Sequence, residues 1–281
     1  MISNAIDKTD VLLEALPYIQ HFHEKVIVIK YGGSALEDEA IRRFVLQDIV
    51  FMHYVGLRPV LVHGGGPFIN KALKDSGIKV VFKDGIRITD SETLFIVREQ
   101  LSKLNQAIVK DLQSLGCASE GLVDLHGVVR ASALSKDLGW VGSIISINTN
   151  PVFSLLSRNE VPVLAPLGID RKRQVYNINA DMVAADLAAA LGAEKLVFLT
   201  NVDGVIENGN LISSMSLSDI KEKVANGIIT GGMLPKVSSG ITAMEKGVNK
   251  VHIVNANLRH GLLLEIFTKE GIGTEIVAED G

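Results

Sequence analysis

Two glycine-rich turns, each at the end of a short apolar run, constrain the fold of this chain most. The run VIVI at residues 26–29 leads into KYGGS at 30–34, and the later run VLV at 60–62 leads into HGGGP at 63–67. Buried strands of open α/β sheets end in this way, and such sheets bind ligands beyond the carboxyl ends of their strands. Because glycine lets backbone N–H groups approach phosphate oxygens, the two turns predict a site that handles phosphate.

Strand and helix patterns alternate along most of the chain. The patterns predict strands over 26–30, 59–63, 79–82, 161–165, 196–200 and 250–254, and helices over 10–20, 39–56, 67–76, 91–115, 180–191, 219–225 and 235–246. Pro17 is expected to bend or break the first helix. Short β-rich pieces between residues 123 and 147 predict hairpins laid over one end of the sheet. The fold class is therefore α/β, with a largely parallel central sheet sandwiched by helices.

Charge and cysteine content exclude several classes of protein. The net charge is −4, from 28 basic and 32 acidic residues, and no segment is strongly basic, so we expect no nucleic-acid partner. The single cysteine, Cys117, cannot form an intramolecular disulfide and is expected to be buried. The longest uncharged stretch, residues 138–157, is interrupted by asparagine, proline and glycine, so we expect no membrane span. The first 25 residues lack a signal or transit pattern, which favours a cytosol-like compartment.

The glycine turns match neither of two common nucleotide-binding motifs completely. The Walker A pattern is absent. The dinucleotide fingerprint is met in part by Gly64 and Gly66, but Ile69 stands where a small residue is required. Asp84 follows at the distance of a ribose-binding acid, so these features alone leave a hydride-transfer enzyme open.

Lys30 is not explained by a dinucleotide site, whereas phosphoryl transfer needs positive charge at such a position. A third glycine turn, GGMLPK at 231–236, places Lys236 in the first turn of a helix, where anions are favoured. Each lysine alone could simply be a solvated surface residue. Asp181 opens the alanine-rich helix and is either a helix cap or the acid that holds both lysines in place.

Six motifs in order resemble those of the amino-acid kinase family. They are KYGGSAL (30–36), VLVHGGGP (60–67), DGIRITD (84–90), NINAD (177–181), LTNVDGV (199–205) and GGMLPK (231–236), and the resemblance runs from about residue 24 to residue 277. Within the family the chain is most similar to members that transfer the γ-phosphoryl group of ATP, with Mg²⁺, to the side-chain carboxylate of N-acetyl-L-glutamate in arginine biosynthesis.

The resemblance implies roles for particular residues. Lys30 and Lys236 match the lysines that stabilise the transition state, and Asp181 matches the aspartate that orients them. The positions implied for substrate binding are Gly64, Gly65, Arg87, Asn177 and Asn179, and those for ATP binding are Gly32, Gly33, Thr200, Asp203, Gly204 and Gly232. No side-chain metal cage is expected, because Mg²⁺ often relies on substrate phosphates and water.

The resemblance extends to members inhibited by L-arginine. It implies an N-terminal oligomerisation helix over 1–24 that joins dimers into a hexamer (a trimer of dimers), an N-acetylglutamate-binding lobe over 25–192 and an ATP-binding lobe over 193–281. The implied arginine contacts are Tyr18, Lys195, His252, Glu265 and Gly271. Relatives in cyanobacteria and plastids bind the signalling protein PII, which leaves that partner, and a plastid stroma beside the cytoplasm, open for this chain.

Two alternatives remain at this point. Another small carboxylate or carbamate kinase of the same family would use the same lysines. A non-catalytic arginine sensor would keep only the effector site, and the intact set of Lys30, Asp181 and Lys236 argues against it.

Overall fold

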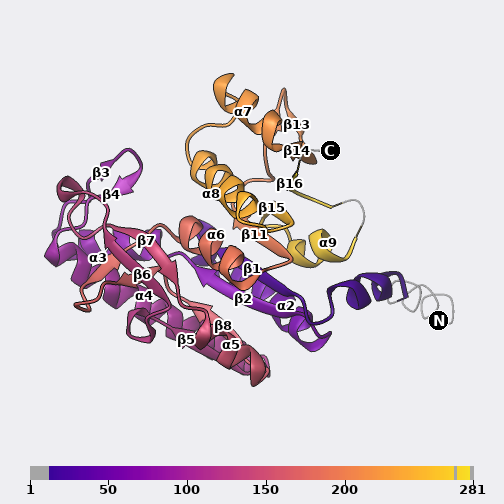
Figure 1. Cartoon of the computed structure of the whole chain (residues 1–281), viewed down its shortest axis with the longest axis horizontal. Coiled ribbons are helices and arrows are strands. Elements are labelled where there is room, and N and C mark those ends of the chain that lie inside the picture. The colour runs from indigo at the N-terminus through magenta and orange to yellow at the C-terminus, as the bar shows by residue number, and fades with distance from the viewer. Residues whose placement is uncertain (1–12, 269–270, 279–281) are drawn as a thin grey trace.

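An eight-stranded sheet forms the centre of the protein, as the computed structural model shows for residues 13–268 and 271–278 (Figure 1). Its strand order is β14-β16-β15-β11-β1-β2-β8-β5. In that order the bounds are Ser214–Ser216, Thr274–Val277, Lys250–Asn255, Lys195–Thr200, Val26–Tyr31, Arg58–His63, Val161–Leu164 and Ser119–Leu122. All neighbouring strands pair in parallel except β15 and β16, which are antiparallel. The expected fold class is confirmed.

Helices cover both faces of this sheet, because alternate residues of the buried strands point to opposite sides. On β1, Val28 belongs to one apolar core, whereas Ile27 and Ile29 belong to the other. The first core is closed by α5 (Asn150–Ser157), α6 (Ala180–Leu191), α7 (Leu217–Ala225) and α8 (Met233–Glu245). The second is closed by α2 (Glu39–Tyr54), α4 (Ser91–Ser114) and α9 (Gly261–Phe267). The strands are thus buried on both sides, as continuous apolar runs predict.

A smaller sheet and two hairpins lie beside the carboxyl-end loops. The four-stranded sheet has the order β10-β9-β6-β7, with bounds Val175–Asn177, Leu167–Ile169, Val129–Ala133 and Gly142–Ile147. The hairpins are β3–β4 (Phe82–Lys83 and Ile86–Arg87) and β12–β13 (Ile206–Glu207 and Asn210–Leu211). The predicted hairpin region is confirmed in β6 and β7, which pair antiparallel, although β9 and β10 complete their sheet. Helix α3 (Gly66–Asp75) follows the second glycine turn, with its proline in the first turn as expected.

One local prediction was wrong, and of the bend or break expected at Pro17 the break does not occur. The strand expected over 79–82 is instead a hairpin centred on Asp84 and Gly85, which have φ angles of 51° and 76°. An Asp-Gly pair with positive φ suits a tight hairpin turn, so the extended pairing begins only at Phe82. The described part of the N-terminal helix runs without interruption from 13 to 22, so Pro17 does not break it; the first residues of the predicted helix lie outside the described residues.

Several short elements were not predicted at all, namely α5, α9, β5, β9, β10, β12, β13, β14 and β16. None of the helices within residues 13–268 and 271–278 is long and apolar enough to cross a membrane. Cys117 is buried, as expected.

Candidate functional site

Strand β1 determines where Lys30 points. The strand is buried along its whole length, and its alternation places Val28 and Lys30 on the face covered by α6. Lys30 is itself 7% exposed. A buried ammonium group needs a partner of opposite charge. Helix α6 supplies it.

The start of α6 presents Asp181 to this lysine. Asn179 caps the helix, since its Oδ1 accepts a hydrogen bond from the Asp181 N–H at 2.7 Å. The cap fixes Asp181 in the first helical turn, and its carboxylate lies 2.9 Å from Lys30 Nζ through Oδ1. The side-chain oxygen of Asn179 is therefore occupied by the helix, although the residue was expected to contact substrate; it lines a neighbouring cavity with Asp84 and Met182.

Lys236 reaches the same carboxylate from α8. Its Nζ lies 3.2 Å from Asp181 Oδ2, so each carboxylate oxygen faces one ammonium group. Burial alone would raise the pKa of Asp181, but the charges of Lys30 and Lys236 hold it below its usual value. Burial, together with the nearby charge of Lys30, lowers the pKa of Lys236. The structure thus brings together the three residues expected to be catalytic, with two positive charges held around one negative charge.

The first two glycine turns touch beside this cluster. A Cβ on Gly32 would lie 3.0 Å from Lys30 Nζ and 3.3 Å from the Gly64 Cα. The Gly64 N–H also donates to the Tyr31 carbonyl at 2.7 Å. Gly65 is tight for another reason, because a Cβ there would lie 2.6 Å from Leu101 Cδ2 of α4. A side chain at Gly32 or Gly64 would push the two turns apart, and one at Gly65 would displace Leu101, so the close approach needs glycine at these positions.

His63, which precedes these glycines, is fully buried and structural. Burial lowers the pKa of His63 to about 4, so the ring is neutral at pH 7. Its Nδ1 donates to the Gly64 carbonyl at 2.7 Å, which leaves Nε2 to accept from Asn105 Nδ2 at 3.1 Å. The ring therefore holds the second turn in place through two hydrogen bonds.

Arg87 and Asn177 meet across Thr89. The Thr89 hydroxyl donates to the Arg87 carbonyl at 2.9 Å and accepts from Asn177 Nδ2 at 3.2 Å. Arg87 Nη2 donates to Asn70 Oδ1 at 2.6 Å, and its guanidinium carbon lies 4.9 Å from the centroid of the Phe82 ring. The other terminal nitrogen, Nη1, is buried and has no hydrogen-bond partner among the described residues. An arginine held on one side with one donor left over suits recognition of a carboxylate.

A cavity of about 440 Å³ adjoins Lys236 on the side of β11. Three of the residues expected to bind ATP line it, namely Thr200, Gly204 and Gly232. Apolar side chains form much of the remaining wall: Val202, Val205, Ile206, Ile228, Ile229 and Met233. Asp203 was also expected to bind ATP, but it does not line this cavity; its Oδ1 accepts a hydrogen bond from Asn255 Nδ2 at 2.7 Å. The cavity combines an apolar wall with a lysine at its end, as a nucleotide requires.

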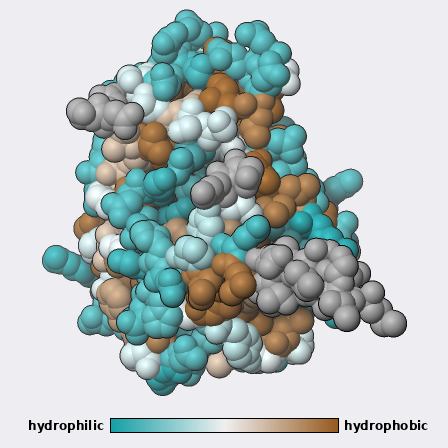
Figure 2. Space-filling model, turned by 90° about the vertical axis from the view of Figure 1, so that its right-hand side faces the viewer, coloured by the Kyte–Doolittle hydropathy of each residue, from teal (hydrophilic) through white to brown (hydrophobic). Residues whose placement is uncertain are grey.

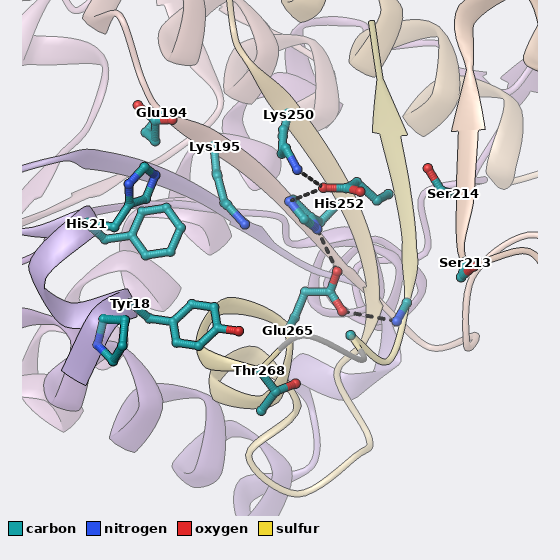
Figure 3. A pocket seen from close by; sticks show the side chains of 15 residues that line it. Tyr18, His21, Glu194, Lys195, Ser213, Ser214, Lys250, His252, Glu265 and Thr268 are labelled. Atoms are coloured by element: carbon teal, nitrogen blue, oxygen red, sulfur yellow. Dashed lines mark hydrogen bonds and ion pairs between the residues drawn. The ribbon is translucent and has the colours of Figure 1, made fainter. Parts of the chain in front are cut away.

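A second, separate cavity of about 540 Å³ lies between the N-terminal helix and the other end of the sheet (Figure 3). Its lining includes all five residues expected to contact arginine: Tyr18, Lys195, His252, Glu265 and Gly271. Figure 3 shows the Tyr18 ring pointing from the helix toward Glu265 and Thr268. These residues come from four distant segments of the chain, and the fold brings them together.

Both signs of charge face this second cavity. Glu265 Oε1 lies 2.6 Å from His252 Nδ1, and its Oε2 accepts the N–H groups of Ile272 at 2.7 Å and Gly273 at 3.1 Å. Burial would raise the pKa of Glu265, but these partners hold it below its usual value, so the carboxylate is charged. Lys195 Nζ lies 4.9 Å from the centroid of the Phe22 ring, and burial lowers its pKa. A ligand with both an acidic and a basic end would match this lining.

Some contacts of the sites were not foreseen. Asn70 on Arg87, Thr89 between Arg87 and Asn177, and Asn105 on His63 are polar side chains without a motif of their own. The one signal for Asn70 was its place on the helix that opens from the second glycine turn. Among the described residues, no group of three His, Cys, Asp or Glu side chains could hold a metal ion.

Comparison with known proteins agrees with this geometry. The family model described as "Amino acid kinase family" matches residues 25–255. A protein of Aquifex aeolicus named acetylglutamate kinase is 45% identical, over 99% of this chain and 100% of its own length. One of the same name from Methanocaldococcus jannaschii is 44% identical, over 98% of this chain and 97% of its own.

A solved structure is similar over nearly the whole chain. It is the N-acetylglutamate synthase of Neisseria gonorrhoeae in complex with coenzyme A and N-acetyl-glutamate, with 26% identity and a TM-score of 0.87. The similarity covers 97% of this chain and 64% of that one. The match of the family model over most of the sequence, together with these relatives, shows that the chain belongs to the amino acid kinase family.

Proposed function

We propose that this protein transfers the γ-phosphoryl group of ATP to the side-chain carboxylate of N-acetyl-L-glutamate. The observation that carries the proposal is the pairing of Lys30 and Lys236 on the two oxygens of Asp181, beside the touching glycine turns. The relatives named acetylglutamate kinase, aligned over nearly their whole length, support the same choice of acceptor.

The reaction needs positioning and charge neutralisation more than acid–base chemistry. A carboxylate oxygen of the acceptor attacks the γ-phosphorus, and the bond from that phosphorus to the β–γ bridging oxygen breaks, which gives an acyl phosphate and ADP. A carboxylate carries no proton at pH 7, so no general base is required. Lys30 and Lys236 stabilise the charge on the migrating group, and Asp181 keeps both ammonium groups in place.

The acceptor and the nucleotide occupy opposite sides of the lysines. Arg87 Nη1, which lacks a partner among the described residues, binds the α-carboxylate, and Asn177 binds the acetamido group. ATP lies in the cavity of Thr200, Gly204 and Gly232. Both oxygens of Asp181 are engaged by the lysines, so this carboxylate is not left to bind a metal ion. The site therefore fits a Mg²⁺ ion that would be held mainly by phosphate oxygens and water and would neutralise charge on the nucleotide.

We also propose that L-arginine inhibits the enzyme by binding in the second cavity. Glu265, anchored by His252 and two backbone N–H groups, pairs with the guanidinium group, while Lys195 contacts the carboxylate. Tyr18 closes the cavity from the N-terminal helix. The mixed charge of the lining supports a ligand that carries both signs.

The N-terminal helix supports oligomer formation. Leu13 and Leu16 are 59% and 44% exposed. Figure 2 shows several hydrophobic patches on this side of the molecule, separated by hydrophilic surface. We infer that a second copy of the chain covers this face, in a trimer of dimers. Three further proposals rest on the family resemblance. The chain has an N-acetylglutamate-binding lobe over 25–192 and an ATP-binding lobe over 193–281. Its location is the cytoplasm or a plastid stroma, and the protein PII is a candidate partner.

Acyl-phosphate formation tests the activity. The enzyme is incubated with ATP, Mg²⁺ and hydroxylamine, with N-acetyl-L-glutamate, glutamate, aspartate and carbamate as parallel acceptors. We expect hydroxamate with N-acetyl-L-glutamate above all others, and a fall in kcat of about 100- to 1,000-fold for Lys30→Ala. Lys246→Ala is the control, because Lys246 pairs with Asp186 at the surface of α6. A preference for carbamate would favour the other small-kinase reading, and no turnover with any acceptor would favour a non-catalytic arginine sensor.

Arginine inhibition is tested separately. Activity is titrated with L-arginine in the full chain, in a deletion of residues 1–24 and in Glu265→Gln. We expect the half-inhibiting concentration to rise at least about tenfold in both variants, since each loses one side of the cavity. Unchanged inhibition in the deletion would remove the helix from the mechanism.

A further inference from the structure

A hydrogen bond between a buried carboxylate and a partly exposed histidine joins α2 to the start of α9. Asp48 of α2 is 1% exposed, and its Oδ1 lies 2.6 Å from Nδ1 of His260, the residue that precedes α9. The pair spans 212 positions of the chain. His260 has φ of 57° and makes no side-chain cap to its own helix, so its ring is free to turn toward α2.

Aromatic contacts extend this join along both helices. The Phe44 ring lies 5.4 Å from the His260 ring, between centroids, and 5.0 Å from the guanidinium carbon of Arg259. About two helical turns further along both helices, Phe51 meets Phe267 with ring centroids 5.7 Å apart in an edge-on arrangement. Helix α9 is thus fixed to α2 at both of its ends, and Figure 1 shows the two helices side by side.

The segment that carries His260 runs between the two cavities. It begins at Asn255, which donates to Asp203 at the loop of the nucleotide cavity. It ends in α9 at Glu265, which faces the second cavity. Asp48 holds this segment midway, from a helix that follows the first glycine turn.

Burial makes Asp48 a costly residue to keep. It raises the pKa of Asp48 to about 6, although the His260 side chain and the backbone N–H groups of Leu262 and Leu263 favour the charged form. An apolar residue would pack here without that cost. Buried charges that work against stability often serve function or specificity, and this one has no place in the phosphoryl-transfer step.

We propose that Asp48 and His260 form a coupling pair, through which occupancy of the second cavity changes the affinity of the catalytic site for its substrates. The proposal rests on the proposed arginine site and deepens it. Both residues are positioning residues, because neither lines the cavity of Glu265 nor that of Thr200. Helix α9 is the element whose position both sites affect. Its Glu265 faces the second cavity, and its other face packs on α2, the helix that follows the first glycine turn.

Coupling between two sites is reciprocal, which supplies a readout that a merely structural role would not move. The Kd of L-arginine is measured by calorimetry with and without N-acetyl-L-glutamate plus a non-hydrolysable ATP analogue. We expect the wild-type ratio of these two constants to lie in the range of about 5- to 150-fold that is typical of coupled sites. In Asp48→Asn we expect a ratio near 1, with the uninhibited kcat within about twofold of the wild-type value.

Variants of His260 distinguish loss of the side-chain contact with Asp48 from strain at the positive φ of residue 260. His260→Gly removes the ring but tolerates the positive φ, and should lower the ratio as Asp48→Asn does. His260→Asn keeps a donor near the position of Nδ1 and also tolerates that φ, so it should restore at least half of the coupling free energy. Asp111→Asn is the matched control. Asp111 of α4 pairs with Arg42 of α2, with 3.0 Å between Oδ2 and Nε, so the substitution breaks a contact of α2 and leaves α9 unchanged.

The outcomes are distinct. If L-arginine binds to the wild-type enzyme with coupling, and the Asp48→Asn variant gives the same ratio of Kd values, the coupling pair alone is overturned. No arginine binding to the wild-type protein would overturn the effector site and the coupling pair together. A ratio that falls equally in Asp111→Asn would also contradict the proposal, since loosening α2 anywhere would then suffice.

Discussion

Asp181 is the residue on which the geometry of the proposed phosphoryl-transfer site depends. The buried ammonium group of Lys30 and the partly buried one of Lys236 would repel each other without it, and the N-cap of Asn179 fixes its place. Each carboxylate oxygen serves one lysine. The acid therefore acts through Lys30 and Lys236, and its loss should affect the transition state more than the binding of either substrate.

Asp181→Asn tests this role. The amide keeps the size of the side chain but removes the negative charge that holds both ammonium groups, so each is less well placed. We expect kcat to fall about 100- to 1,000-fold, with smaller changes in the two KM values. Steady-state kinetics are compared with Asp186→Asn, on the same helix, which loses only the surface partner Lys246. A kcat within twofold of the wild-type value would contradict the assignment.

Arg87 offers a prediction about affinity rather than rate. One of its terminal nitrogens is fixed by Asn70 and the other is left for a ligand. Lysine cannot reproduce the planar fork, so Arg87→Lys should lose one charge-assisted hydrogen bond, or about 1.5–3 kcal/mol. We expect the KM for N-acetyl-L-glutamate to rise about 10- to 100-fold and the KM for ATP to stay within about twofold. An increase confined to the KM for ATP would place Arg87 on the wrong side of the site.

Sequence reasoning identified the residues of this site by their setting, and missed those that hold them. Lys30 and Lys236 stood out because each adjoins a glycine turn. Asp181 stood out at the start of a helix, as either a cap or the partner of both lysines, and the family resemblance supplied Arg87. Thr89, Asn70 and Asn105 carry no such mark. Their contacts join residues 88, 17 and 42 positions apart, and a single sequence contains no record of which distant polar groups meet.

At the scale of elements, the turns are as important as the strands that precede them. Gly64 faces Gly32, and a Cβ on Gly64 would lie 3.2 Å from the Gly32 Cα, so Gly64→Ala must move the turns apart by a few tenths of an ångström. A misplacement of about 1 Å can cost 100-fold in rate, so we expect kcat to fall about 10-fold with little change in folding. Gly66→Ala, with no described atom within 4 Å of its Cβ, is the control in the same turn. Equal kinetics for the two variants would contradict the need for close approach.

The contact of α2 with α9 makes stability depend on pH in a definite direction. Burial raises the pKa of Asp48 to about 6, above its value of about 3.9 in an unfolded chain. Between these values the native state binds more protons, so the stabilising contribution is complete below about pH 4 and is lost as the pH rises through about 6. The asparagine variant does not titrate.

Urea unfolding of the wild-type protein and of Asp48→Asn measures this contribution. The free energy of unfolding of the wild type, relative to the variant, should fall by about 1–2 kcal/mol between pH 5 and pH 7.5. The comparison cancels the titration of shared groups that do not contact Asp48. A difference that is constant with pH, or that grows as the pH rises, would show that Asp48 is not destabilised by burial.

Longer elements followed from periodicity, and short ones did not. The pattern predicted α6 with the bounds Ala180–Leu191 that the structure has, because the cap and the alanine-rich face both mark it. Helix α9 and strand β16 are short and depend on packing against α2 and β15, so local sequence gave no signal. The strand expected over 79–82 failed for a local reason, since Asp84 and Gly85 specify a hairpin turn.

The whole molecule is held together by a sheet that crosses the proposed lobe boundary after residue 192. Strand β1 pairs with β2 of its own lobe on one side and with β11 of the other lobe on the other side. Both apolar cores contain residues from both proposed lobes: Val28 and Phe198 share one, and Ile29 and Val197 share the other. Neither lobe can separate without exposing core surface.

We therefore expect the two lobes to unfold as one cooperative unit. Phe198→Ala removes a fully buried ring from β11, and should lower the free energy of unfolding by about 3–5 kcal/mol. Scanning calorimetry at a fixed protein concentration should show one transition in both proteins, moved to lower temperature as a whole in the variant. Two resolved transitions, with only the one that reports on residues 193–281 affected by the substitution, would mean that the lobes fold independently despite their shared sheet. In that case closure of the site between lysines from the two lobes would depend on how the lobes dock, and no longer on a continuous core.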